Sequence, residues 1–124
     1  MHLPARTACI MAILFTACRH RASEPELAGQ WEVGCSIDIC TIINLAPDHT
    51  FALRFEDSDS PYASGDWRLD QGYLVMRTLS TRVPDMKADI GKERRVVISQ
   101  LQSDRLVLTP TEDPKTPLTW KRLP

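Results

Sequence analysis

Apolar and polar residues alternate along much of this chain, and the alternation limits the folds open to it. In residues 50–56 (TFALRFE), apolar side chains occupy every second position from Phe51. A period of two is typical of a strand with one face in a core and the other in water. Residues 66–69 (DWRL) and 118–122 (LTWKR) repeat this pattern. Such strands can shelter their apolar faces only in a shared interior, so we expect a β protein.

Residues typical of turns separate these segments at short intervals, which predicts that strands adjacent in sequence are paired. Pro47 suits a tight turn and Gly72 supplies a left-handed position, whereas residues 84–90 indicate about one turn of helix. Closing a sheet of this size removes its exposed edges. We therefore expect an all-β, antiparallel up-and-down meander of seven or eight strands, forming a small barrel or half-barrel. The expected strands are residues 29–35, 40–45, 50–56, 64–69, 73–79, 94–101, 105–109 and 118–123.

The N-terminus carries a short apolar run, residues 8–15 (ACIMAILF), followed by two small residues and Cys18. The run is about half the roughly 20 residues of a membrane-spanning helix, so a retained span is the weaker interpretation. These residues resemble the bacterial lipoprotein signal, although Phe15 stands where that family usually has an aliphatic residue. The resemblance implies that residues 1–17 are removed and that Cys18 is acylated. The alternative is an ordinary signal peptide with an incidental cysteine.

The same resemblance implies a location. Two or more acyl chains hold a protein stably on a bilayer. Arg19 follows the cysteine, where the family has Asp in proteins retained at the inner membrane, so the periplasmic side of the outer membrane is implied. Residues 18–26 have no apolar periodicity and predict a flexible tether, which leaves residues 27–124 as the folded domain.

Charge and motif content argue against several classes of function. The formal net charge is −1, and no basic stripe interleaved with aromatic residues indicates nucleic-acid binding. His49 follows Asp48 in an expected turn, where adjacent side chains point apart instead of converging as a catalytic triad requires. The acidic run 56–60 lacks the glycine and final glutamate of a calcium loop. We therefore expect no enzymatic activity, no cofactor and no metal site.

Two cysteines belong to the expected domain, Cys35 and Cys40, with four residues between them. In a β-hairpin with residues 36–39 as its loop, the two would face each other closely enough for a disulfide. An even pair in an exported domain favours this bridge. The alternative is half of a zinc site, which needs two more ligands when the remaining histidines are His20 and His49.

Three short motifs carry a second resemblance. Residues 27–31 read LAGQW, residues 47–51 read PDHTF and residues 65–67 read GDW. They resemble the bacterial lipocalin-like lipoproteins, whose pattern is L-x-G-x-W, then P-D-G-T-F, then G-x-W. His49 replaces the turn glycine of that pattern, which leaves the turn type open.

This likeness implies a lipocalin-like β domain and assigns structural roles within it. Glycine lets the chain bend as it enters a barrel and tryptophan plugs the closed end, which are the roles we expect for Gly29 and Trp31. In lipocalins a basic residue of the last strand lies across that tryptophan. Arg122 shares a face with Trp120, so we expect a cation–π contact between Arg122 and Trp31.

A barrel of about eight strands can hold one small ligand at its mouth, so binding of a small hydrophobic ligand is the first functional hypothesis. The alternative for the aromatic residues is plain core, because small barrels fill with their own side chains. The candidate ligand-binding residues are Phe51, Phe55, Trp67, Tyr73 and Met76.

The second functional hypothesis is binding of a periplasmic protein by an envelope lipoprotein, such as a lysozyme-type inhibitor or an immunity protein. Lipoprotein inhibitors of lysozyme insert a loop into the enzyme, and they are similar in size and location. Residues 60–65 and 81–92 are the loops that could serve here.

Overall fold

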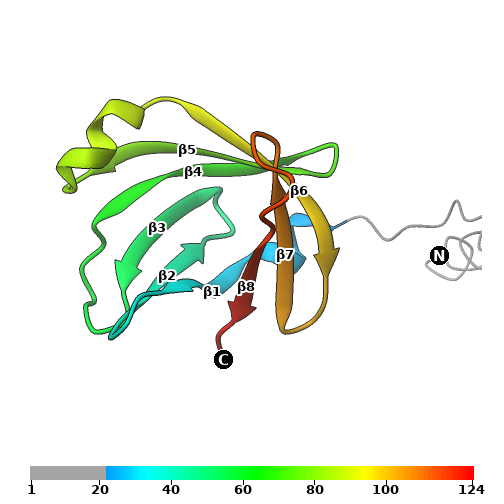
Figure 1. Ribbon diagram of the computed structural model, residues 1–124, viewed down its shortest axis with the longest axis horizontal. Coiled ribbons are helices and arrows are strands. Elements are labelled where there is room, and N and C mark those ends of the chain that lie inside the picture. Colours follow the sequence, from blue (N-terminus) through cyan, green and yellow to red (C-terminus); the bar gives the residue numbers. More distant parts are fainter. Residues whose placement is uncertain (1–21) are drawn as a thin grey trace, which may run out of the picture.

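The computed structural model describes residues 22–124, an all-β domain in which successive antiparallel strands close into a barrel (Figure 1). This confirms the expected fold class, and every expected strand is present within two residues of its expected bounds. Residues 1–17, Cys18 and His20 lie outside the described part. From residue 22 onward, no helix is long and apolar enough to cross a bilayer. In chain order the elements are α2 Glu24–Leu27, β1 Gly29–Cys35, β2 Cys40–Leu45, β3 Thr50–Phe55, β4 Ala63–Asp70, β5 Tyr73–Thr81, η1 Pro84–Asp89, β6 Glu93–Leu101, β7 Arg105–Pro110 and β8 Leu118–Arg122.

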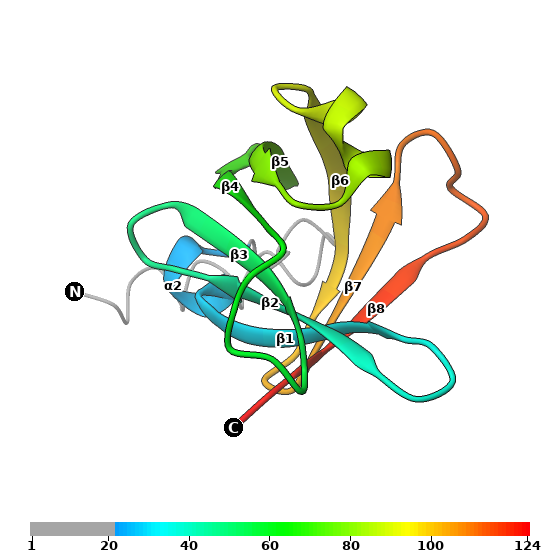
Figure 2. The ribbon, with the colours of Figure 1, turned by 90° about the vertical axis from the view of Figure 1, so that its left-hand side faces the viewer.

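The up-and-down order gives the barrel two different ends. The short connections at residues 46–49, 71–72 and 102–104 gather with α2 at one end, which we call the closed end. The connections at residues 36–39, 56–62, 82–92 and 111–117 gather at the other end, which we call the open end. Figure 2 looks toward the open end and shows η1 beside the mouth. The chain therefore enters the domain on the side away from the mouth.

Two buried tryptophans belong to the core toward the closed end. Trp31 is fully buried and its Nε1 donates a hydrogen bond to the carbonyl oxygen of Leu27 at 2.8 Å. Trp67 is also buried and donates to the carbonyl oxygen of Ala46 at 3.0 Å. Burying an indole is favourable only when its N–H finds a partner, and here both do. The remaining core cluster is Leu27, Ile43, Leu45, Phe51, Leu74, Val96, Leu106, Leu108 and Trp120.

The expectation of a flexible tether up to residue 26 is wrong for its last residues, because α2 begins at Glu24. The Glu26 carboxylate accepts hydrogen bonds from the backbone N–H and the hydroxyl of Ser23, so Glu26 supplies the carboxylate contact of a capping box with Ser23. Pro25 in the first turn has a φ already suited to a helix. Four residues are too short for a stable isolated helix. Burial of Leu27 in the core supplies the stabilisation that local sequence lacks.

The β2–β3 connection shows how histidine substitutes for the expected glycine. The N–H of His49 donates to the carbonyl oxygen of Ala46, which closes a turn with Pro47 at its second position. His49 then adopts a left-handed conformation with φ +72°, the position usually occupied by glycine in a three-residue hairpin loop. Histidine is one of the few side chains that tolerate this region. The Asp48 carboxylate accepts from the N–H and hydroxyl of Thr50, which holds the loop together and lowers the pKa of Asp48.

Two glycines of the motifs allow close approach of neighbouring groups. Gly29 has φ +130°, and a Cβ there would lie 2.9 Å from Nη1 of Arg122. A Cβ on Gly65 would lie 1.9 Å from the backbone oxygen of Arg77, at a register shift between β4 and β5. Any larger residue at Gly65 would therefore push the two strands apart.

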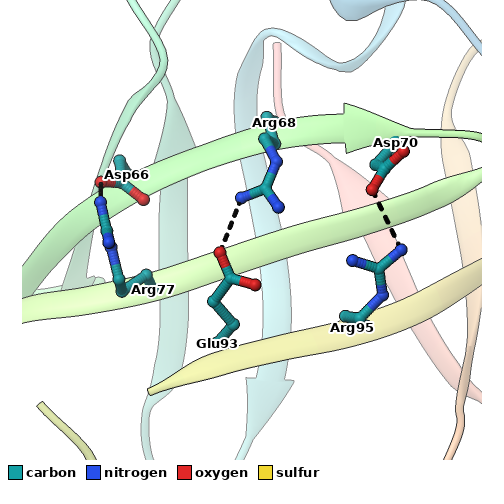
Figure 3. Close-up of polar contacts among 6 residues, drawn as sticks. All are labelled: Asp66, Arg68, Asp70, Arg77, Glu93 and Arg95. Atoms are coloured by element: carbon teal, nitrogen blue, oxygen red, sulfur yellow. Dashed lines mark hydrogen bonds and ion pairs between the residues drawn. The ribbon is translucent and has the colours of Figure 1, made fainter. Parts of the chain in front are cut away.

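The outer face of β4, β5 and β6 carries three ion pairs, drawn in Figure 3. Arg68 contacts Glu93 at 2.9 Å, Arg77 contacts Asp66 at 2.8 Å, and Arg95 contacts Asp70 at 3.1 Å. The first and third pairs join β4 to β6 across β5. Val75 of β5 faces outward in register with Arg68 and Arg95 and is nevertheless 1% exposed, so the aliphatic parts of these arginines cover an apolar residue.

Candidate functional site

The open end of the barrel contains a cavity of about 340 Å³. This volume is near the lower limit of pockets that hold small molecules. Its walls come from β1, β2, β3, β5, β8 and the segment from η1 to the start of β6. The lining residues are Val33, Ile43, Phe51, Leu53, Met76, Thr78, Met86, Asp89, Lys92, Glu93, Arg94 and Trp120.

The floor of the cavity is apolar because strand alternation and register bring inward-facing residues together. Leu53 pairs with Ile43 across β2 and β3, and Met76 pairs with Trp67 across β4 and β5. Residues directly opposite each other in an antiparallel sheet point to the same face. Phe51 and Trp120 are almost completely buried and complete the wall of the cavity.

One side of the cavity lies where β1 and β8 separate. These strands pair at Trp31–Arg122 and Glu32–Lys121, near the closed end. Toward the open end they diverge, as Figure 2 shows. Val33 of β1 and Trp120 of β8 line the cavity on the two sides of this seam.

The rim of the cavity carries charged residues, most of which already have partners. Lys92 Nζ lies 3.8 Å from a carboxylate oxygen of Asp89. The Glu93 carboxylate accepts a hydrogen bond from Arg68 on the outer face of the barrel. That hydrogen bond, followed by the positive charge of Arg68, lowers the pKa of Glu93. Glu93 is therefore an ionised group directed away from the interior.

Arg94 differs from the other charged residues of the rim because its strand position faces inward. It pairs with Met76, whose side chain lines the cavity, so the two lie on the same face of the sheet. Its Nη2 lies 3.4 Å from Oε1 of Glu112 in the β7–β8 loop. The pKa of Glu112 is lowered chiefly by its own backbone N–H and by the Thr111 hydroxyl, and less by Arg94.

The structure brings two of the five candidate ligand-binding residues, Phe51 and Met76, into the cavity and places the other three elsewhere. Trp67 is core at the closed end, as the alternative interpretation had it. Phe55 is 41% exposed at the end of its strand and stacks on Tyr62, with ring centroids 4.8 Å apart. Tyr73 faces outward, since its neighbour Leu74 is the buried one, and the Arg95 guanidinium lies 4.8 Å from its ring centroid.

Several lining residues were not among the sequence-based candidates. Leu53 and Trp120 lie on the apolar side of alternating segments, so that signal could have identified them. Arg94 could not be identified in this way, because its inward position depends on the register between β5 and β6. Val33 and Ile43 likewise depend on strand pairing, Val33 at the register shift in β1 and Ile43 opposite Leu53.

At the closed end, the expected contact between Arg122 and Trp31 is confirmed. The guanidinium carbon lies 4.1 Å from the centroid of the Trp31 ring. The same guanidinium donates hydrogen bonds to three backbone carbonyls, those of Ser103, Ala28 and Glu26, with the first two at 2.9 and 3.1 Å. Arg122 therefore joins the β6–β7 turn and the N-terminal segment to the base of the barrel.

A second link fastens the N-terminal segment at this end. His49 Nε2 lies 2.6 Å from Oε1 of Glu24, and the His49 ring meets the Trp67 ring edge-on with centroids 5.6 Å apart. The sequence-based expectation that His49 is a turn residue fits this position. The contact with Glu24 was not anticipated, because residues 18–26 were expected to lack a fixed structure.

At the open end, the expected disulfide between Cys35 and Cys40 is confirmed, with an S–S distance of 2.01 Å. The cysteines are directly paired across β1 and β2, as the hairpin predicted. The Glu32 carboxylate lies within 4.8 Å of both sulfurs, which is ligand spacing for a metal. Sulfurs bonded to each other do not act as thiolate ligands, so the bridged form does not fit the zinc alternative.

The residues around the mouth also include exposed apolar side chains. Ile37 at the tip of the β1–β2 hairpin is 98% exposed, and the other large exposed apolar residues among residues 22–124 are Phe55, Leu79, Ile90 and Leu118. All five belong to loops or strand ends at the open end. The closed end thus holds buried apolar residues, whereas the open end presents apolar residues to solvent.

No protein-family model matches this sequence, and a search of curated proteins finds no significant match.

Proposed function

We propose that this protein binds a small hydrophobic ligand in the cavity at the open end of its barrel. The observation that carries the proposal is an apolar floor beneath a charged rim in a cavity of about 340 Å³. Apolar surface that faces an unfilled cavity loses contacts, and a ligand restores them. The role is binding without catalysis. His49, the histidine of residues 22–124, is engaged by Glu24 at the opposite end.

We propose in addition that the protein is a lipoprotein held on the periplasmic side of the outer membrane through Cys18. The support is the apolar run and small residues before Cys18, together with Arg19 after it. The domain begins at the closed end, where α2 packs. An anchor attached there would leave the mouth directed away from the membrane that carries it.

Ligand binding is tested with N-phenyl-1-naphthylamine, a neutral dye that fluoresces in apolar surroundings, added to the full chain. We expect a saturable rise in fluorescence that hydrophobic competitors reverse. Leu53→Trp should abolish this rise because the larger ring occupies the cavity. Thr119→Trp is the matched control, since Thr119 is an exposed outward-facing residue of β8. Equal dye binding by both variants would show that the dye is not in this cavity.

The anchor is tested with Cys18→Ser in the full-length precursor. We expect the variant to move from the membrane fraction to the soluble periplasmic fraction, and metabolic labelling with palmitate to disappear. Unchanged fractionation of this variant would refute lipidation at Cys18.

Binding of a periplasmic protein is the second candidate, because five large apolar side chains are exposed around the mouth. Tyr62 and Phe55 stack at one side of the mouth, in and beside the β3–β4 loop. A lysozyme-type inhibitor would lower the rate of cell-wall hydrolysis in a lytic assay. Ile37→Ser with Ile90→Ser should relieve that inhibition without unfolding the domain, and the absence of any inhibition would remove this class of partner.

A further inference from the structure

We propose that the ligand of the cavity is a single-chain amphiphile with an anionic head group, and that Arg94 binds the head. This rests on the proposed binding of a hydrophobic ligand at the open end and specifies its chemical class. The apolar chain would lie along Phe51, Leu53, Met76 and Trp120, and the head would remain at the rim.

The inference starts from how the charges of the cavity lining are paired. Asp89 and Lys92 have each other at 3.8 Å, and Glu93 has Arg68 on the outer face at 2.9 Å. Arg94 is the remaining charged residue of the lining, and its partner Glu112 is not part of the lining. Glu93 also has its partner outside the lining, but Glu93 points to the outer face, whereas Arg94 lies on the same face as Met76. The charge directed toward the cavity is therefore the positive charge of Arg94.

The position of Arg94 suits a head group better than a structural role. It lies at the start of β6, close to the mouth. The next inward-facing residue along the strand, Val96, is already buried. A charge placed deep in the barrel would carry a large desolvation cost, whereas a charge at the rim stays hydrated. A chain that enters apolar end first would therefore place its head within reach of this guanidinium.

The contact between Arg94 and Glu112 does not prevent such binding. The N–O distance is 3.4 Å, and the two side chains are 70% and 61% exposed. Exposed pairs of this kind contribute little to stability. A carboxylate or phosphate can accept two parallel hydrogen bonds from one guanidinium, which is a stronger arrangement. We therefore expect a ligand head to replace Glu112 as the partner of Arg94.

The test compares competitors that share one chain and differ in the head: dodecanoate, dodecyl phosphate, dodecanol and dodecylammonium, each displacing N-phenyl-1-naphthylamine below its micellar concentration. We expect the two anions to displace the dye at concentrations about two- to fivefold lower than dodecanol, the range for a partly exposed charge contact. Added salt should reduce this advantage. The ratio between dodecanoate and dodecyl phosphate tells whether a carboxylate or a phosphate is preferred.

Variants identify the residue responsible. Arg94→Gln should bring the anions to the level of dodecanol, whereas Arg105→Gln, the same change at the closed end, should leave their advantage intact. Glu112→Gln should strengthen binding of the anions, because it removes the competing carboxylate. Glu112→Gln keeps the proposal testable if Arg94→Gln folds poorly.

The outcomes separate the two proposals. If all four competitors displace the dye equally well, the head-group inference fails and hydrophobic binding stands. If dodecylammonium binds best, the acidic residues of the rim dominate and the inference fails. If no competitor displaces the dye and the dye itself does not bind, the proposed function fails as well.

Discussion

Inward- and outward-facing residues alternate along the strands at both ends of this barrel, yet the closed end is filled with side chains and the open end contains a cavity. At the closed end, inward-facing positions hold Trp31 and Trp67, whose rings fill the interior and whose N–H groups donate to backbone carbonyls. At the open end, inward-facing positions such as Leu53 and Met76 surround a cavity. The difference comes from side-chain volume and from what covers each end, because the backbone pattern is common to both.

The coverings also differ. At the closed end, α2 and three short connections lie against the core, and Arg122 bonds to carbonyls of the N-terminal segment and a turn. At the open end, longer connections and η1 surround the mouth, and η1 contributes no buried residue. The comparison teaches that stability should depend on the closed end and ligand binding on the open end. The following substitutions test that division.

The largest effect should come from Trp31→Ala. Removing a fully buried tryptophan leaves a cavity and typically costs about 3–5 kcal/mol of unfolding free energy. The change also removes the ring on which Arg122 rests. We expect urea denaturation to show a loss in this range, with a domain that is marginal or unfolded at 37 °C.

Trp120→Ala is the matched change at the other side of the interior. The Trp120 ring already borders the cavity, so fewer packing contacts are lost, and we expect roughly half the destabilisation of Trp31→Ala. Its effect on dye binding should be the larger of the two. Equal destabilisation by both changes would contradict the division between the ends.

Sequence patterns predicted the closed end better than the open end. Alternation predicted the strands, and the resemblance predicted that Trp31 would meet Arg122, because each large ring or charge there occupies a defined inward position. The role of α2 could not be predicted. Its four residues have no period of their own, and they are ordered by burial of Leu27 and by contacts from His49 and Arg122.

The cavity was predicted only in part, because an open space depends on the volumes of the side chains and on what covers that end, as well as on which residues face inward. Phe51 and Met76 follow from alternation. Tyr73 was expected to face inward, but the register of β5 turns Leu74 inward instead. Arg94 required the pairing of β5 with β6, and pairing register is not contained in the sequence of either strand alone.

An effect comparable to that of Trp120→Ala should come from Arg122→Met, which keeps much of the side-chain bulk and removes the charge. Three backbone carbonyls would lose their donor, and hydrogen bonds from charged groups contribute about 1.5–3 kcal/mol. We expect a loss of about 2–3 kcal/mol and earlier proteolysis near residues 22–28. Arg122→Lys should recover only part of the stability, because one ammonium cannot reach three separate carbonyls. Dye binding at the mouth should remain unchanged in both variants below the unfolding transition.

The disulfide tests the open end. Replacing both Cys35 and Cys40 by Ser should cost about 2 kcal/mol, the chain-entropy value for so short a loop. We expect the loss to appear in the unfolding free energy, together with faster hydrogen exchange in the β1–β2 hairpin. Exchange of the Trp31 N–H should follow global unfolding, as in the unmodified protein. A selective opening of the closed end in this variant would contradict the division.

The smallest effect should come from Glu93→Gln, on the outer face at the border between the rim and the ion pairs of Figure 3. The hydrogen bond from Arg68 lowers the folded-state pKa of Glu93, so ionised Glu93 contributes stability above the ordinary carboxyl pKa of about 4.3. That contribution is lost as pH falls through the lowered pKa. Glu93→Gln should therefore lower Tm by a few degrees at most at pH 7, and the difference should shrink as pH falls below the ordinary carboxyl pKa.

Asp57→Asn in the exposed β3–β4 loop is the matched control, since it removes the same charge from the same end of the barrel. We expect its Tm to follow the unmodified protein across this pH range. Differential scanning calorimetry at pH 3, 5 and 7 makes the comparison. If Glu93→Gln and Asp57→Asn behave alike, net charge accounts for the effect and the Arg68 contact does not. If only Glu93→Gln loses Tm at pH 7, the outer ion pairs stabilise the sheet while leaving the cavity on its other face free for a ligand.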